Sequence, residues 1–268
     1  MLRVANCLLG EDLGDDTLII GTSGRYEFKN KGIDVFLESL NRLNRDKDLK
    51  KKVLAFVNVP SWVGDPREDL QKRLKSKDKF TEPLQCPFIT HWLHNMTHDQ
   101  VLDMLKYLGM GNRPEDKVKV IFVPCYQDGH DGILNKHYYD LILGEDLSVY
   151  PSYYEPWGYT PLESVAFRVP TITTDLAGFG LWVNSLKNQH GIDDGVEVLH
   201  RSDYNYSEVA DGIKDTVALF STKTEAEIKE IRKRAGQVAE QALWKHFIKY
   251  YYEAYDIALC NAMKRQLR

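Results

Sequence analysis

Runs of consecutive apolar residues alternate with amphipathic stretches along the first half of the chain. The segments Thr17–Thr22, Val53–Val59 and Val118–Val123 are of strand length and rich in β-branched side chains. Such continuous runs are typical of strands buried on both faces of a parallel sheet. Between the first two runs, apolar residues recur at helical spacing, at Ile33, Phe36, Leu37, Leu40 and Leu43. The pattern predicts strand, helix, strand as the opening unit.

The same alternation continues downstream. Helices are predicted at about 101–109, at about 136–143 and from Pro161 onward, and strands at 147–150 and 171–173. Strands that alternate with helices indicate a doubly wound parallel sheet of the Rossmann-like α/β class. In such sheets ligands bind beyond the carboxyl ends of the strands, so the loops that follow the strands form the candidate site.

Two regions depart from this alternation. Residues 60–92 carry charge-rich helical fragments and a loop marked by prolines, which we interpret as an insertion. The tail is helical, with a capping box predicted at Thr222 and Glu225. Its last segment, 244–268, presents a largely aromatic face made by Trp244, Phe247, Ile248, Tyr251 and Tyr255. This face needs a partner surface.

Composition narrows the class of protein. The chain has 268 residues, 43% of them hydrophobic, so it can bury a full core. Its formal net charge of −4 offers no basic field for nucleic acid or for a membrane surface. No segment approaches the ~20 apolar residues of a membrane span, and no signal peptide is recognisable. The four cysteines are scattered without paired spacing, which favours reduced thiols in a cytoplasmic protein.

The stretch 153–163 carries the most distinctive chemistry. Two carboxylates, Glu155 and Glu163, flank a loop that Pro156 stiffens and Gly158 loosens. We predict a capping box in which Thr160 is the N-cap and Glu163 the third helical residue. The helix that follows would then direct free N–H groups and a positive dipole end at an anionic ligand.

Four ordered blocks of sequence resemble one family. Residues 151–161, Pro-Ser-Tyr-Tyr-Glu-Pro-Trp-Gly-Tyr-Thr-Pro, resemble the donor-site signature of eukaryotic-type glycogen (starch) synthases. Residues 24–32 resemble that family's first strand-to-helix loop, residues 94–96 its Thr-His-Asn-Met segment, and residues 173–180 its Thr-Thr-Asn-Leu-Ser-Gly-Phe-Gly segment. The chain is identified as a member of that family on these blocks.

The resemblance implies a fold and an activity. Such enzymes have two facing Rossmann-like domains, the GT-B architecture, and all four blocks belong to the second, C-terminal domain. Residues 1–268 would form a single donor-binding domain, with 60–92 inserted and 244–268 in contact with a missing N-terminal acceptor domain. The family transfers glucose from UDP-glucose to the non-reducing 4-hydroxyl of an α-1,4-glucan such as glycogen, with retention of configuration and without a metal or other cofactor.

A chain that spans only the donor domain is expected to bind UDP-glucose without appreciable synthesis. Transfer requires the acceptor hydroxyl to be held against the donor carbon in a water-poor cleft, and one wall of that cleft would be absent. Glycogen would bind through the missing domain. The sequence leaves open whether the full-length form is a homo-oligomer. The family's arginine-rich regulatory helix has only Arg232 and Arg234 here, which predicts weak or absent activation by glucose 6-phosphate.

The resemblance assigns three catalytic residues. Arg25 and Lys31 bracket the first strand-to-helix loop, where two cations can converge on a diphosphate and stabilise the leaving phosphate. The alternative for both is a solvated loop. Glu155 would contact the sugar hydroxyls and support developing oxocarbenium charge, although a lone loop carboxylate more often caps a nearby backbone N–H.

The same resemblance assigns the substrate-binding residues. Tyr138, seventeen residues before Glu155, would stack on uracil, with helix packing as its alternative. Glu163 would bind the ribose hydroxyls, although a capping role alone explains it. The rest of the pocket would be lined from the 151–161 block, by Trp157, Gly158, Tyr159 and Thr160. Trp157 could equally belong to the core.

Other interpretations remain open at the sequence level. The chain could belong to another retaining GT-B glycosyltransferase with a different sugar nucleotide, or it could be a non-catalytic glucan-binding module. The 175–180 segment is interpreted as an amide nest near the sugar, with a tight turn as the alternative. His91, His94 and His98 match no dependable ligand spacing, so no metal site is predicted.

Overall fold

A six-stranded parallel sheet forms the centre of the protein. The computed structural model describes residues 1–186 and 191–266. The strands lie in the order β5-β2-β1-β6-β7-β8, which places the first strand of the chain in the middle of the sheet. Their bounds are β1 Leu18–Ser23, β2 Val53–Asn58, β5 Val118–Val123, β6 Leu147–Val149, β7 Thr171–Thr174 and β8 Val196–Leu199. The doubly wound parallel sheet predicted from the sequence is confirmed.

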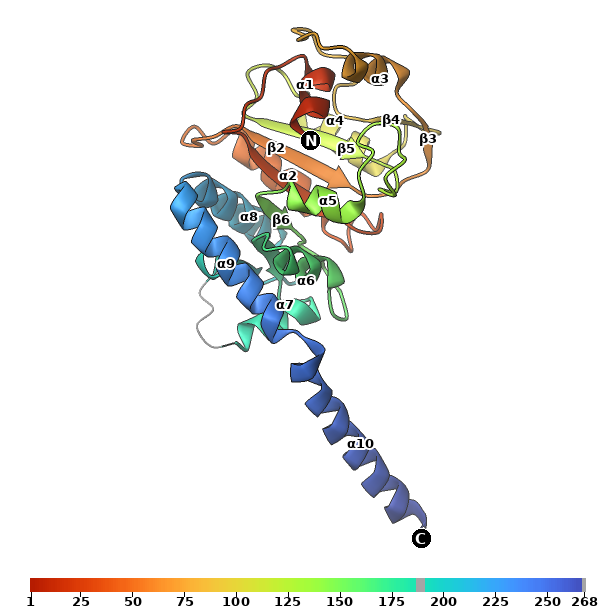
Figure 1. Cartoon of the computed structure of the whole chain (residues 1–268), viewed down its shortest axis with the longest axis vertical. Helices are drawn as coiled ribbons and strands as arrows, with labels where there is room; N and C mark the ends of the chain where they lie inside the picture. Colours follow the sequence, from red (N-terminus) through yellow and green to blue (C-terminus); the bar gives the residue numbers. More distant parts are fainter. Residues whose placement is uncertain (187–190, 267–268) are drawn as a thin grey trace.

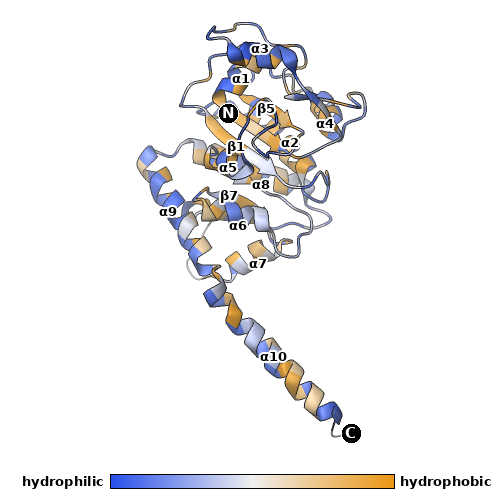
Figure 2. Cartoon of the chain, turned by 45° about the vertical axis from the view of Figure 1, so that its right-hand side comes forward, coloured by the Kyte–Doolittle hydropathy of each residue, from blue (hydrophilic) through white to orange (hydrophobic). Residues whose placement is uncertain are grey.

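The central strands are buried on both faces, as their uninterrupted apolar runs predict. In β2, Val53, Ala55 and Val57 face one hydrophobic cluster, whereas Leu54 and Phe56 face a second cluster on the opposite side. Adjacent residues of a strand point to opposite faces, so a strand buried on both faces needs apolar residues at every position. Figure 2 shows these strands as an apolar layer between amphipathic helices.

Helices cover both faces of the sheet (Figure 1). One face is covered by α2 (Ile33–Asn44), α4 (Gln100–Leu108) and α8 (Tyr206–Ser221), which contribute to the larger cluster. The other helices of the body are α1 (Leu2–Leu9), α3 (Glu68–Lys75), α5 (Tyr138–Leu143), α6 (Tyr159–Ala166), α7 (Gly178–Asn184) and α9 (Glu225–Gln241), with a 3₁₀ turn at Ile192–Asp194. Helix α1 and strand β8 were not predicted from the sequence.

The 60–92 segment forms a small unit of its own. Strands β3 (Val63–Pro66) and β4 (His91–Leu93) pair antiparallel, and α3 lies between them in sequence. Arg67 is fully buried, and its guanidinium donates hydrogen bonds to the main-chain oxygens of Gln85 (2.7 Å), Cys86 (2.8 Å) and Ile89 (3.2 Å). A buried arginine therefore organises the unit. This explains why its apolar pattern is weak.

Both predicted capping boxes are misplaced. Helix α6 begins at Tyr159 with Gly158 as its N-cap, and no side chain caps it, so Thr160 lies inside the helix. Gly158 has φ 106°, a conformation that glycine adopts without strain. In α9 the capping box is formed by Thr224 and Glu227, two residues after the predicted pair.

The final helix, α10 (Trp244–Gln266), extends away from the body of the protein (Figure 1). None of its described residues is buried. Only its first turns contact the body, where the Phe247 ring lies 5.5 Å from the rings of Trp157 and Trp182. The amphipathic tail helix is therefore present, and its predicted partner surface is not part of the described chain. Within residues 1–186 and 191–266, no helix has both the length and the apolar character needed to cross a bilayer.

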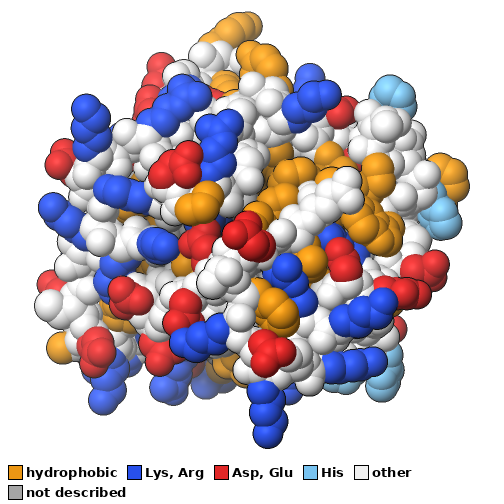
Figure 3. Space-filling view, turned by 90° about the horizontal axis from the view of Figure 1, so that it is seen from above, with side chains coloured by type: hydrophobic (Ala, Val, Ile, Leu, Met, Phe, Trp, Pro, Cys, Tyr) orange, Lys and Arg blue, Asp and Glu red, His pale blue; other side chains and the backbone are white. Residues whose placement is uncertain are grey.

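Charge is distributed without a dominant sign on the face that carries α3. Figure 3 shows lysine and arginine side chains interspersed with aspartate and glutamate over this face, with one apolar patch between them. This pattern agrees with the small formal net charge of −4. Such a surface does not produce the single-sign field that steers nucleic acid toward a protein.

A buried carboxyl group lies between β1 and β6. Glu145 is 2% exposed and accepts a hydrogen bond from Ser148 Oγ at 2.7 Å, and burial raises its pKa from 4.5 to about 8. A side-chain carbon at Gly21 would lie 1.9 Å from Glu145 Oε1, so the strand needs glycine there.

We expect the protein to lose stability as the pH rises from about 4.5 to about 8. In this window the unfolded chain releases the Glu145 proton while the folded chain retains it, so unfolding becomes more favourable. Glu145→Gln removes this dependence and should be more stable than wild type at pH 8, with a smaller difference at pH 5. Urea unfolding at both pH values measures it, with exposed Glu240→Gln as the control. An unchanged pH dependence in Glu145→Gln would contradict the assignment.

Candidate functional site

Four loops meet beyond the carboxyl ends of the parallel strands. They are residues 24–32 after β1, 124–137 after β5, 150–158 after β6 and 175–177 after β7. The Tyr153 N–H donates to Asn30 O at 2.7 Å, and Glu155 pairs with Ala177 in a short parallel bridge. These contacts join loops that are distant in sequence. They bring most of the predicted site residues to one edge of the sheet.

Lys31 and Glu155 form the central contact of the site. The Lys31 ammonium donates directly to Glu155 Oε2, and the two side chains are only 14% and 18% exposed. An ion pair this far from solvent interacts more strongly than one on the surface, because less water screens it. The sequence placed these two residues in the same site from separate motifs, and the structure brings them together.

A close backbone approach fixes this contact. Gly32, the N-cap of α2, has φ 69°, and a side-chain carbon there would lie 2.1 Å from Pro151 O. The same Pro151 oxygen accepts a hydrogen bond from the buried Arg201 guanidinium. The loop that carries Lys31 and the loop that carries Glu155 therefore touch through their main chains, with Arg201 behind them.

The Glu155 loop is also held from its other side. Gly178 N–H donates to Glu155 O at 3.1 Å, and a side-chain carbon at Gly178 would lie 2.3 Å from Pro156 O. This is the part of the 175–180 segment that was expected to form an amide nest. The Asp175 carboxylate accepts a hydrogen bond from Arg201 N–H at 2.9 Å and contacts His200 Nδ1 at 2.6 Å. It therefore joins the turn after β7 to the residues after β8.

Arg25 lies at the outer rim of the site. Its side chain is 74% exposed and pairs with Glu27 at 3.1 Å. The loop turns back on itself, so that a side-chain carbon at Gly24 would be 4.0 Å from Lys31 Cε. The turn that carries Arg25 thus lies close to the Lys31 side chain. An exposed ion pair of this kind contributes little to stability, which leaves Arg25 free to exchange its partner for an anion.

A pocket of about 380 Å³ opens at this turn, and Gly24 and Arg25 line one side of it. Tyr138 and Thr160 line it together with Arg25, as the sequence predicts for a ligand site. Two amide side chains in its wall were not predicted: Asn58 at the end of β2 and Gln127 after β5. Asn58 Oδ1 and Gln127 Nε2 are buried without a hydrogen-bond partner among the described residues. Nothing in their sequence context signals this, because Asn58 ends β2, Gln127 lies in the loop after the neighbouring strand β5, and only the pairing of these strands brings the two together.

Tyr138 is held by a network of hydroxyl groups. Its phenol lies 3.0 Å from Ser23 Oγ, and Tyr150 OH lies 2.8 Å from Ser164 Oγ. Burial raises the pKa of Tyr138 above its ordinary value and raises that of Tyr150 to about 12, so both stay protonated at neutral pH. The network fixes Tyr138 at the start of α5 with part of its ring toward the pocket.

The remaining predicted residues take different positions. Glu163 Oε1 accepts a hydrogen bond from Tyr139 OH at 3.1 Å, which replaces the predicted capping interaction. Trp157 packs against Phe179 with ring centres 6.2 Å apart and joins the aromatic cluster of Trp182 and Phe247, so the core alternative describes its contacts. Tyr159 is 71% exposed at the first position of α6.

A larger hollow lies at the opposite edge of the sheet. Its volume is about 960 Å³, and it is lined near the start of β1 and by α9. Arg232 there donates to Glu145 O at 2.6 Å and lies 3.7 Å from Asp146. We place the candidate site at the carboxyl edge despite the smaller pocket, because ligands of doubly wound sheets bind there and the charged loops converge there.

Comparison with known proteins identifies the family. The glycogen synthase family model matches residues 9–73 and 65–268. Glycogen [starch] synthase isoform 2 of Saccharomyces cerevisiae is 29% identical, over 95% of this chain and 44% of the yeast protein. The Neurospora crassa glycogen [starch] synthase is 28% identical, over 92% and 42% of the two chains. The Caenorhabditis elegans enzyme is 32% identical, over 70% and 35%.

A solved structure agrees on the fold. The α,α-trehalose 6-phosphate synthase of Burkholderia multivorans superposes with a TM-score of 0.56 at 12% identity, over 99% of this chain and 46% of that one. At this identity the likeness concerns the fold alone. This chain spans less than half the length of the curated relatives above. With most of its residues matched by the family model, the chain belongs to the glycogen synthase family.

Proposed function

We propose that this chain is the sugar-nucleotide domain of a glycogen synthase, which binds UDP-glucose for transfer to an α-1,4-glucan. The observation that carries the proposal is the Lys31–Glu155 contact at the carboxyl edge of the sheet, next to the pocket of Tyr138 and Thr160. It combines a cation for phosphate with a carboxylate for a sugar, at the place where this fold binds ligands.

The cations would hold the diphosphate. Cleavage of a bond between a sugar and a diphosphate places negative charge on the departing phosphate, and fixed cations aimed at that charge lower the barrier. Lys31 is nearly buried and so delivers its charge with little screening, whereas Arg25 at the rim can close on the phosphate from the solvent side. The N-terminus of α2 follows directly and adds its dipole.

Glu155 would serve the sugar once the donor is bound. A phosphate that enters beside Lys31 competes with Glu155 for the ammonium group and so leaves the carboxylate available to the glucose hydroxyls. As the bond to the leaving group breaks, the anomeric carbon gains positive charge, which a nearby carboxylate stabilises. We propose that transfer retains the anomeric configuration, as in the family that the sequence resembles.

The pocket beside the cations would take the nucleoside. Tyr138 offers a ring for stacking on uracil, and the unpaired Asn58 oxygen and Gln127 nitrogen offer an acceptor and a donor for the base edge. Glu163, which Tyr139 now holds, would reach the ribose hydroxyls. Gly158, Tyr159 and Thr160 would form the adjoining wall at the start of α6.

We expect isothermal calorimetry to detect one UDP site on the chain, and a radiolabelled transfer assay to detect no appreciable glucan elongation. The physical reason is that an acceptor must be positioned in a water-poor cleft, which the donor domain forms only in part. Robust elongation by this chain alone would refute the second expectation, and absence of UDP binding would refute the first.

Donor identity separates this proposal from the nearest alternative, a retaining glycosyltransferase with another donor. Thermal shift with UDP-glucose, ADP-glucose and GDP-mannose compares them directly, and stabilisation by UDP-glucose above the others supports glycogen synthesis. A module that bound glucan in a pull-down but no nucleotide would instead be non-catalytic. The retained set of Arg25, Lys31 and Glu155 favours the enzyme.

A further inference from the structure

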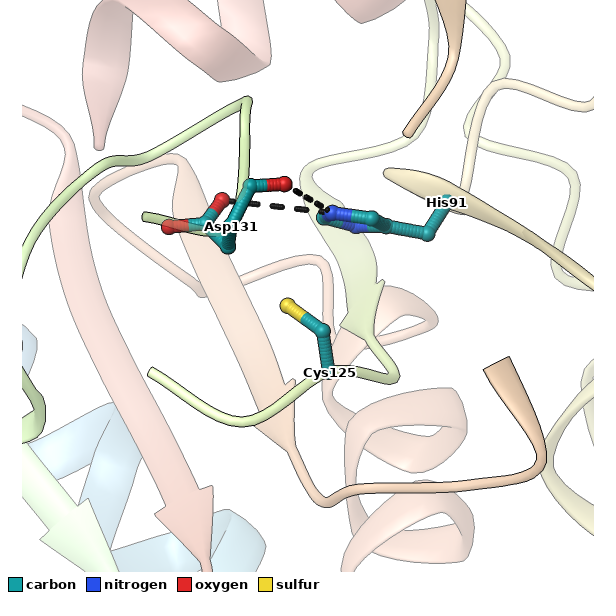
Figure 4. Close-up of side chains that lie close together, drawn as sticks. All are labelled: His91, Cys125 and Asp131. Atoms are coloured by element: carbon teal, nitrogen blue, oxygen red, sulfur yellow. Dashed lines mark hydrogen bonds and ion pairs between the residues drawn. The ribbon is translucent and has the colours of Figure 1, made fainter. Parts of the chain in front are cut away.

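A second cluster of reactive side chains lies outside the cation site. His91 on β4, Cys125 after β5 and Asp131 in the following loop point toward one another (Figure 4). One potential ligand atom from each lies within 4.8 Å of the other two. His91 is 2% exposed, Cys125 is 8% exposed, and the Asp131 side chain is fully buried. These residues come from two segments of the chain, β4 and the 124–137 loop, so the fold brings His91 to the other two.

We propose that His91, Cys125 and Asp131 form a binding site for a thiophilic divalent metal ion, with Zn²⁺ as the most suitable physiological ion. A nitrogen, a sulfur and a carboxylate oxygen are the ligand types that Zn²⁺ accepts, and three protein ligands leave a fourth position for water. Mg²⁺ and Ca²⁺ bind through oxygen ligands and would not use the thiol. The thiolate and the carboxylate together balance the charge of the ion.

The surroundings of His91 fit a ligand role. Its Nδ1 lies 2.9 Å from Thr90 Oγ1, and that hydroxyl lies 3.4 Å from Phe122 O, to which it can donate. With the ring proton on Nδ1, Thr90 accepts it and orients the ring, which is how ligating histidines are commonly held. The other nitrogen, Nε2, then faces the cluster, 4.0 Å from Asp131 Oδ1 and 2.7 Å from Asp131 O.

Binding requires definable changes. Without an ion, Nε2–H donates to Asp131 O at 2.7 Å, so the ring proton must move to Nδ1 and this main-chain oxygen must leave the position that the ion would take. A tetrahedral Zn²⁺ site has its ligand atoms about 3.3–3.7 Å apart, so present separations of up to 4.8 Å must shorten by as much as about 1.5 Å. Asp131 Oδ1 already accepts hydrogen bonds from the Ile133 and Leu134 N–H groups, and Oδ2 accepts one from Asn135 N–H, so the free lone pair for a metal is on Oδ2.

Binding changes the protonation of the cysteine. The thiol proton is released to solvent as the metal–sulfur bond forms, because the thiolate is the form that binds the ion. The ion would tie the 60–92 unit to the loop that leads to Tyr138, and it would lie beside the pocket proposed for the nucleoside, because Cys125 also lines that pocket.

The test uses the full chain after dialysis against a chelator, with Co²⁺ as a spectroscopic probe. We expect one equivalent of Co²⁺ to produce a near-ultraviolet thiolate-to-cobalt band that one equivalent of Zn²⁺ abolishes. At a hundredfold excess over Kd, Zn²⁺ should raise the unfolding temperature by about 5–10 °C. Cys125→Ser should remove the band and weaken binding by at least about 100-fold, whereas the matched control Cys86→Ser should keep both.

Other outcomes decide against the site. Absence of a thiolate band in wild-type protein, or a band that survives in Cys125→Ser, overturns the proposal. If Cys125→Ser fails to fold, Asp131→Asn serves instead, because the amide oxygen can still accept main-chain hydrogen bonds while the negative charge is lost. Unchanged Co²⁺ affinity in Asp131→Asn would likewise overturn it. None of these measurements depends on nucleotide binding, so they are independent of the proposed transferase function.

Discussion

Gly32→Ala is expected to lower the free energy of unfolding by about 3–5 kcal/mol and to weaken nucleotide binding at the same time. Two effects of an added side-chain carbon lower the free energy of unfolding at this position. A left-handed backbone, φ 69°, strains any residue with a side-chain carbon, and that carbon would overlap Pro151 O at 2.1 Å. Relief requires the Lys31 loop and the Glu155 loop to separate, which breaks the contact between these two residues. Chemical denaturation and UDP calorimetry on the same samples measure both effects.

Gly109 supplies the matched control for this prediction. It ends α4 with φ 70°, almost the same conformation as Gly32, but no atom lies within 4 Å of an added side-chain carbon. Gly109→Ala therefore isolates the conformational strain and should cost only about 1–2 kcal/mol, with UDP affinity unchanged. Equal losses in the two variants would mean that the approach of the two loops contributes nothing.

Lys31→Ala is expected to reduce UDP affinity by about 10- to 100-fold, because it removes a charge-assisted hydrogen bond at a poorly solvated position. Lys29 lies in the same loop and is exposed, so Lys29→Ala has the same change in formal charge without the loss of a site contact. Arg25→Ala should fall between the two, because its side chain is 74% exposed. Isothermal calorimetry with UDP at fixed ionic strength measures all three.

Because Lys31 also contacts Glu155, the Lys31→Ala substitution changes two interactions at once. Removal of Lys31 leaves Glu155 partly buried without its cation, so part of any effect reflects repulsion between that carboxylate and the ligand phosphates. Glu155→Gln combined with Lys31→Ala separates the two contributions in a double-mutant cycle. Equal UDP affinity in Lys31→Ala and Lys29→Ala would contradict a phosphate role for Lys31.

Sequence reasoning recovered the sheet because its central strands are short and apolar on both sides. β5 spans Val118–Val123, as predicted, and β2 is one residue shorter than its predicted run. The placement of Lys31 and Glu155 in one site followed from two family motifs and not from periodicity, since 124 residues separate them in sequence, and their direct contact was not predicted.

What the sequence did not reveal depends on tertiary contacts. In the 60–92 unit, Arg67 donates hydrogen bonds to main-chain carbonyl groups. Such contacts do not depend on apolar side chains, so they produce no periodic apolar pattern in the sequence. Helix α6 has Gly158 as its N-cap and starts at Tyr159, because the Glu155 loop turns sharply at this glycine, and this constraint overrides the local preference for Thr160 as N-cap. Asn58 reaches the pocket wall at the end of β2, and Cys125 and Gln127 reach it from the loop after the paired strand β5; the sequence gives no visible sign of this pairing.

Helix α10 determines how the isolated chain should behave in solution. From Lys249 to Gln266 every described residue is exposed, so only hydrogen bonds within the helix and pairs between successive turns oppose its melting. Such a segment frays on a microsecond timescale and exchanges its amide protons long before the sheet does. Contact of its tyrosine-rich side with another surface would stabilise the helix. Slower deuterium uptake by the α10 amides would therefore report that contact.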